Sequence, residues 1–114
     1  MALGDCYEAA VKFVMDTCMF SEDCPYTIVH AEVAGQGPLE GTNFGHAYVV
    51  DKSTGNVLDR SNGRNVTMPR QVYELLGSVP QIGNFHEYSW REAKLKLLEY
   101  EHYGPWDLET STGL

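Results

Sequence analysis

Small and apolar residues recur every three or four positions near the start of the chain, at Cys6, Ala9, Ala10, Phe13, Val14 and Thr17. This spacing places them on one face of a helix, so the pattern predicts a helix over roughly residues 6–19. Asp5 is a typical N-cap residue, and Glu8 follows three positions later, as in a capping box. The polar stretch up to Pro25 marks the end of this helix.

The middle of the chain is rich in β-branched residues, and its apolar and polar residues alternate as is typical of strands. Residues 26–33 form the first expected strand. The glycine-rich segment 34–45 is too irregular for a helix or strand and predicts a long loop. Residues 46–51 and 56–61 then predict two strands joined by a tight turn, in which Gly55 supplies the positive φ that such turns need.

The last third of the chain predicts three further elements. They are a short helix over 67–77, a strand over 85–88 and a helix that begins after Ser89 and continues to about His102. The last helix opens with a second capping box, formed by Ser89 and Glu92. This order of elements predicts an α+β fold, with helices on an antiparallel sheet, in a single domain that spans residues 1–114.

Composition narrows the classes of function. The chain has 114 residues, of which 43% are hydrophobic, so it can supply a buried core. Sixteen acidic and eight basic residues give a net charge of −8, which argues against binding to a nucleic-acid backbone. No stretch approaches the ~20 apolar residues of a membrane span, and the acidic start is unlike a secretory signal. We therefore expect a cytoplasmic protein that contacts neither nucleic acid nor membrane.

Three cysteines, Cys6, Cys18 and Cys24, are an odd number for a disulfide framework. We expect Cys18 and Cys24 to be core or inert thiols. A zinc site built from the three cysteines and His30 is an alternative, but structural zinc usually has paired ligands two to four residues apart, and the gaps here are longer. We therefore expect neither a metal nor a cofactor.

Cys6 is the cysteine with the clearest chemical potential, because it lies at the start of the first predicted helix. The helix dipole favours a thiolate at that position and predicts a lowered pKa. A thiolate nucleophile needs a base to move protons and a group to orient the base. His46 and Asp59 are the candidates for these two roles. Simple packing in the core is the alternative role of Cys6.

The predicted hairpin places the two candidates on one face of the sheet. If Asp51 faces Asn56, then His46 and Asp59 are diagonal neighbours, with Cα atoms about 7–8 Å apart. Parity makes His30 a further candidate for the same cleft, although a structural role is the simpler interpretation. Asp59 has an alternative role as the cap of the Ser61–Gly63 turn.

The order of these residues resembles that of the papain-like and transglutaminase-like cysteine hydrolases. His46-Ala47-Tyr48-Val49-Val50 followed by Val57-Leu58-Asp59 is similar to the His-Ala-Trp-Val-Glu…Asp signature of the transglutaminase-like branch. The resemblance covers about residues 4–62, and Tyr7 stands where that family usually has a tryptophan. The chain is also similar to small phage and bacterial proteins of this class.

The resemblance implies a minimal papain-like fold and a Cys-His-Asp triad. Cys6 would attack the carbonyl of a peptide or another amide-containing substrate, His46 would transfer the proton, and Asp59 would orient the imidazole. A peptidase, an amidase or an acyl transferase, acting in a bacterial or phage-infected cell, is the implied activity. The alternative is a non-catalytic acidic binding or inhibitor module, such as a phage-encoded one, that keeps the fold.

Overall fold

The computed structural model describes residues 5–19, 21, 23–34, 41, 43–79 and 84–108. Its elements are α1 (Cys6–Cys18), β1 (Tyr26–Ala34), β2 (Asn43–Asp51), β3 (Asn56–Asp59), the 3-10 turn η2 (Ser61–Gly63), β4 (Val66–Pro69), α2 (Arg70–Leu76), β5 (Phe85–Ser89) and α3 (Trp90–Tyr100). The predicted α+β class, with one helix near each end of the chain and an antiparallel sheet, is confirmed. No helix in the described ranges has the length and apolar character needed to cross a membrane.

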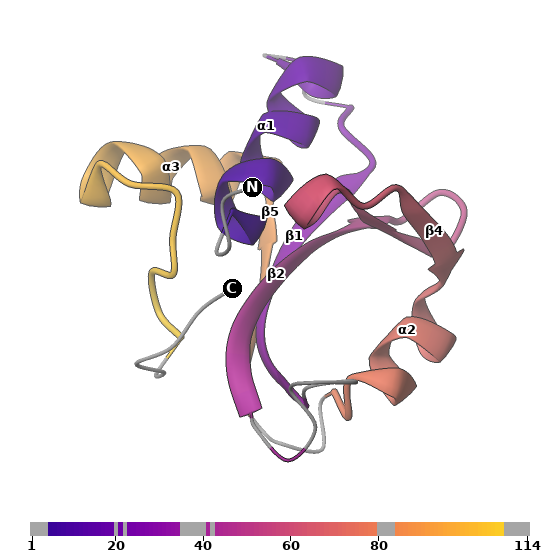
Figure 1. The fold of residues 1–114 in the computed structure, drawn as a ribbon. Helices are drawn as coiled ribbons and strands as arrows, with labels where there is room; N and C mark the ends of the chain where they lie inside the picture. The colour runs from indigo at the N-terminus through magenta and orange to yellow at the C-terminus, as the bar shows by residue number, and fades with distance from the viewer. Residues whose placement is uncertain are drawn as a thin grey trace.

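The sheet has the order β4-β3-β2-β1-β5, and every neighbouring pair is antiparallel. The predicted hairpin register is confirmed, because Asp51 lies opposite Asn56. Gly55 has a φ of 77° in the turn, as expected. Figure 1 shows that β1 and β2 curve, with α1 on one side and α2 and β4 on the other.

Alternate residues of the strands supply two separate hydrophobic clusters. On the face covered by α1 and α3, Ala47 and Val49 of β2 pack with Ile28 of β1. On the face toward α2, which we call the α2 face, Tyr48 and Val50 pack with other buried side chains. The period of two in β2 therefore places His46 on the α2 face as well.

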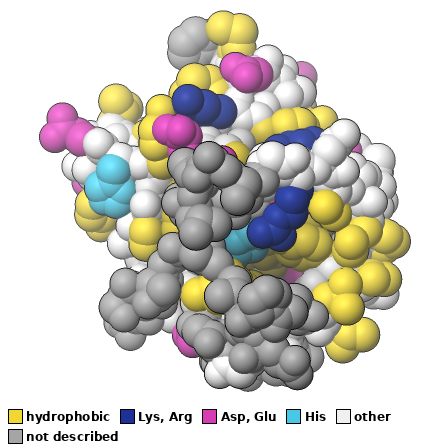
Figure 2. All heavy atoms as spheres, in the orientation of Figure 1, with side chains coloured by type: hydrophobic (Ala, Val, Ile, Leu, Met, Phe, Trp, Pro, Cys, Tyr) yellow, Lys and Arg dark blue, Asp and Glu magenta, His cyan; other side chains and the backbone are white. Residues whose placement is uncertain are grey.

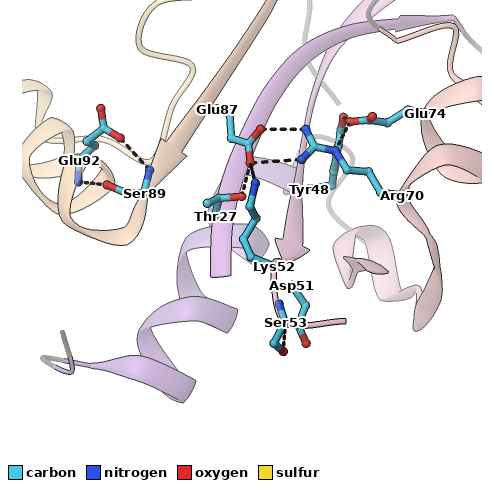
Figure 3. Close-up of polar contacts among 10 residues, drawn as sticks. All are labelled: Thr27, Tyr48, Asp51, Lys52, Ser53, Arg70, Glu74, Glu87, Ser89 and Glu92. Carbon is cyan, nitrogen blue, oxygen red and sulfur yellow. Dashed lines mark hydrogen bonds and ion pairs between the residues drawn. The ribbon is translucent and has the colours of Figure 1, made fainter. Parts of the chain in front are cut away.

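The two predicted capping boxes have different outcomes. Asp5 occupies the N-cap position of α1, as predicted, but its side chain makes no capping hydrogen bond, so the predicted capping box at this helix is wrong. At α3, the Glu92 N–H donates to Ser89 Oγ at 3.1 Å and the Ser89 N–H donates to Glu92 Oε1 at 3.0 Å, as Figure 3 shows. The Ser89 box is confirmed, while α3 ends at Tyr100 instead of His102.

Strand pairing corrects the bounds of two predicted segments, a helix and a loop. The helix expected over 67–77 begins at Arg70, because the preceding residues form β4 and pair with β3 at the edge of the sheet. Pro69 ends that edge strand, a position where its missing N–H is tolerated. The loop expected over 34–45 is shorter at both ends, since β1 includes Ala34 and β2 begins at Asn43; residues 35–40 and 42 lie outside the described residues.

Cys18 and Cys24 form a disulfide, with their Cα atoms 5.5 Å apart. The expectation of two inert thiols is therefore wrong. The spacing along the chain did not reveal that the turn after α1 brings the two residues together. The bond ties the end of α1 to the segment before β1, and it uses two of the four ligands of the alternative zinc site.

We expect reduction of this disulfide to lower the free energy of unfolding by about 2 kcal/mol, because the bond closes only a short loop in the unfolded chain. Thiol titration in denaturant should find one thiol before reduction and three after it. The Cys18→Ser/Cys24→Ser double variant should show the same loss of stability without any reductant. Three thiols before reduction would contradict the pairing.

Candidate active site

His46 and Asp59 lie side by side on the α2 face, as the hairpin register predicts. His46 Nε2 is 3.3 Å from Asp59 Oδ2. The two residues are only 4% and 2% exposed. A buried contact between an imidazole and a carboxylate can set the position of the proton on the ring.

Asp59 uses its two oxygens for different purposes. Oδ1 accepts hydrogen bonds from the backbone N–H of Ser61 at 3.0 Å and from Ser61 Oγ at 2.6 Å. The turn-capping alternative is therefore correct, and it coexists with the contact to His46. Burial opposes ionisation of Asp59, but the hydrogen bonds from His46 and Ser61 outweigh it and lower the pKa of Asp59. Asp59 is therefore a carboxylate at neutral pH.

Tyr73 of α2 is a third member of this cluster, and sequence reasoning missed it. Its hydroxyl donates to Asp59 Oδ2 at 2.7 Å, and its oxygen lies 2.9 Å from His46 Nε2. Burial and the negative charge of Asp59 raise the pKa of Tyr73, so the phenol keeps its proton. No local pattern links Tyr73 to residues 14 and 27 positions earlier in the chain.

These contacts determine the tautomer of His46. The single proton of the Tyr73 hydroxyl is directed at Asp59, so the Tyr73 oxygen can only accept at Nε2, and ionised Asp59 is also an acceptor. Nε2 must therefore carry the proton. Nδ1 of His46 is then a lone pair, and it is buried without a hydrogen-bond partner among the described residues. A neutral imidazole held in this way can accept a proton at Nδ1.

Cys6 is the first residue of α1 and is completely buried. It borders one narrow gap together with Asp59 and Ala47, the residue after His46 in β2. Burial, helped by the charges of Asp59 and Asp5, raises the pKa of Cys6 to about 11, although hydrogen bonds from the backbone of Ala47 and Tyr7 lower it. The expectation of a lowered pKa is wrong, because burial outweighs the position at the helix start. The resting group is a thiol.

Comparisons with protein-family models, with curated proteins and with solved structures give no match. What these residues can do therefore follows from their own geometry. Within the described ranges, no group of three or more His, Cys, Asp and Glu side chains has the arrangement of a metal site.

A polar network holds α2, and with it Tyr73, against the sheet (Figure 3). Arg70 at the start of α2 donates to Glu87 of β5 at 2.8 Å and to Glu74 at 3.0 Å. Glu74 in turn accepts a hydrogen bond from Tyr48 of β2 at 2.6 Å. Because Glu74 follows Tyr73 directly, these contacts position the Tyr73 hydroxyl over the His46–Asp59 pair.

His30 does not share a face with His46, so the interpretation from parity is wrong. It is completely buried on the other face, with its ring centre 4.8 Å from those of Tyr7 and Trp106 and 5.1 Å from that of Tyr88. Burial lowers the pKa of His30 to about 3. This aromatic environment fits a structural role for His30, which was the simpler interpretation from the sequence.

Proposed function

We propose that this protein is a papain-like cysteine hydrolase that cleaves an amide-type bond with Cys6, His46 and Asp59. One observation carries the proposal. Nε2 of buried His46 is held as a donor, while Nδ1 has no hydrogen-bond partner among the described residues. An imidazole can act as a base when one nitrogen is available and a carboxylate at the other nitrogen stabilises the imidazolium, and His46 has both features. Buried His30 also has unpaired nitrogens among the described residues, but its ring contacts are aromatic and its pKa is lowered to about 3. In the proposed mechanism Nδ1 of His46 accepts the proton of Cys6, so this nitrogen must be available.

The proposed reaction has two stages. Cys6 Sγ bonds to the substrate carbonyl carbon as its proton moves to His46 Nδ1, and the tetrahedral intermediate then releases the amine, which receives that proton. The acyl group remains on Sγ as a thioester. Water then attacks the thioester, giving one proton to Nδ1, and the acid leaves as the proton returns to Sγ. Ionised Asp59 stabilises the imidazolium formed in each stage.

The burial of Cys6 adds two features to this mechanism. With a pKa of about 11, the thiol loses its proton during attack and not beforehand. Because the side chain has 0% exposure, a peptide or other amide-containing substrate reaches it only after local opening at the first turn of α1. Opening of this kind is compatible with helix termini, which are less stable than helix centres.

We test the proposal with Asp59→Asn. The Asn oxygen can keep the Ser61 contacts while its NH₂ group replaces Oδ2, so the ring must turn or change tautomer and Nδ1 is lost as a base. We expect turnover of an acyl anilide to fall about 10- to 100-fold, less than the ~10⁴ known for a serine triad. Removal of the negative charge should at the same time lower the pKa of Cys6, because Asp59 raises it.

Asp51→Asn is the matched control. Asp51 also accepts from the backbone N–H and the hydroxyl of the serine two positions later, at 2.9 and 2.6 Å, but it lies in the exposed hairpin turn (Figure 3). This variant should change neither turnover nor the pH dependence of Cys6 alkylation. Equal turnover in wild type and Asp59→Asn would refute the role of Asp59.

The complete burial of Cys6 favours one second candidate, a non-catalytic acidic binding module with a charge of −8 directed at a basic partner. In that case Cys6 is a core residue, and its alkylation should require global unfolding. If Cys6 is alkylated in native buffer faster than the protein unfolds, the binding module is rejected in favour of the hydrolase.

For the location, we propose the cytoplasm of a bacterial or phage-infected cell, as the resemblance implies. Disulfides are rare in that compartment, and Cys18 and Cys24 form one. Thiols trapped by alkylation inside the cell test this location: a Cys18–Cys24 bond present before lysis indicates an oxidising compartment instead.

A further inference from the structure

A pocket of about 360 Å³ opens on the α2 face, beside the His46–Asp59 pair. Most of its wall is apolar and comes from β1, β2, β4 and α2, including Val33, Phe44, Val66 and Met68. Its polar side chains are His46, Asp59, Tyr73 and Arg64. Cys6 is not part of this wall, whereas Asp59 borders both the pocket and the gap at Cys6. An apolar pocket of this size with a few polar groups is typical of small-molecule sites.

The apolar surface continues outside the pocket along α2. Leu76 borders the pocket and is 54% exposed, and Leu75 and Val72 on the same helix are 72% and 49% exposed. Figure 2 shows hydrophobic side chains gathered on the right of the view, where α2 lies in Figure 1. An apolar group that enters the pocket can therefore remain in contact with apolar surface at its outer end.

Arg64 determines what kind of polar group a ligand can place beside the His46–Asp59 pair. Its side chain is half exposed, and its guanidinium lies 3.7 Å from Asp59 Oδ2, which is too long for a hydrogen bond. Its N–H donors can therefore serve an acceptor on a ligand. Because ionised Asp59 already balances the charge of Arg64, an anion placed there would gain little net attraction in return for its lost hydration, and a neutral carbonyl oxygen is the better fit.

We propose that this pocket binds the apolar acyl group of a neutral amide, with the amide carbonyl at Arg64. The assignment of this pocket as the acyl site of an enzyme rests on the proposed hydrolase function. The binding of an amide to the pocket does not depend on that function. The proposed substrates are thus amides of medium-length aliphatic acids, with the carbonyl next to His46.

Binding is measured by calorimetry on the Cys6→Ala protein, so that no turnover interferes. The probes are the linear primary amides from butanamide to decanamide, with the matching carboxylates as a second series. Each added methylene should tighten amide binding up to about fourfold, because burial of one CH₂ contributes ~0.8 kcal/mol. The affinity should stop rising once the chain fills the pocket. Carboxylates should bind more weakly than the amides of equal length at pH 7.

Two pairs of variants locate the ligand. Val66 and Thr67 are neighbours in β4, and Val66 lines the pocket while Thr67 is exposed. In the Cys6→Ala background, Val66→Phe should remove most of the gain from longer chains but retain butanamide binding, and Thr67→Phe should have no effect. Arg64→Gln should weaken all amides by a similar factor, about 10- to 100-fold. Arg91→Gln, on the exposed side of α3, is its control.

Three results would overturn the proposal: no amide binds, chain length has no effect, or Val66→Phe and Thr67→Phe behave alike. Tighter binding of carboxylates would reject the neutral carbonyl at Arg64. Failure of the proposed hydrolase is distinguishable, because it would leave amide binding intact while wild-type protein shows no Cys6-dependent turnover.

Discussion

Cys6→Ala should abolish covalent acylation of the protein by p-nitrophenyl hexanoate, and His46→Ala should slow it by about 10²–10⁴-fold. The first variant removes the nucleophile, and the second removes the base that takes its proton. The effect of His46→Ala should be large here, because the thiol pKa of about 11 leaves almost no thiolate at neutral pH. Intact-protein mass spectrometry measures the added acyl group, and release of nitrophenolate measures its rate.

The disulfide simplifies this experiment. Since Cys18 and Cys24 are bonded to each other, Cys6 is the cysteine that retains a thiol. Thermal unfolding controls for the fold, and Cys6→Ala should lower stability by only about 1–2 kcal/mol. His86→Ala, on β5, serves as the control for loss of a histidine. Equal acylation of Cys6→Ala and wild type would refute the assignment of the nucleophile.

Mild acid should destabilise the protein strongly through His30. The folded pKa of His30, about 3, lies below its ordinary value of 6.5 because the ring is buried, with a further lowering by His86 that Asp107 opposes. Below pH 6.5 the unfolded chain therefore binds a proton that the folded protein excludes. The free energy of unfolding should fall by about 1.4 kcal/mol per pH unit, or roughly 3 kcal/mol between pH 6.5 and 4.

Urea unfolding at a series of pH values measures this slope. His30→Leu should remove most of it above pH 4, whereas the exposed His102→Gln should leave it unchanged. Asp59 has a lowered pKa, so it contributes stability above its unfolded pKa near 4 and loses that contribution as the pH falls further. His30→Leu should therefore keep a steep loss below pH 4. An unchanged slope above pH 4 in His30→Leu would contradict the role of His30.

Short-range signals in the sequence determined a large part of the fold. The hairpin register, with Asp51 opposite Asn56, follows from a tight turn at Gly55 and the period of two in the strands. The Ser89–Glu92 box defines the start of α3, because capping depends on residues within one turn. The contact of His46 with Asp59 was predictable for the same reason, since the two strands are joined by that turn.

The tertiary structure alone decided the contacts that depend on the path of the chain. The sequence between the first two predicted strands contains no turn signal that sets their register, so it did not determine which face His30 occupies. Tyr73 reaches Asp59 only because Arg70 and Glu74 hold α2 over the sheet. The burial of Cys6, and with it the raised pKa, depends on how α1 packs on the sheet. A helix start favours a thiolate through local dipoles, but desolvation by the surrounding core is the larger effect.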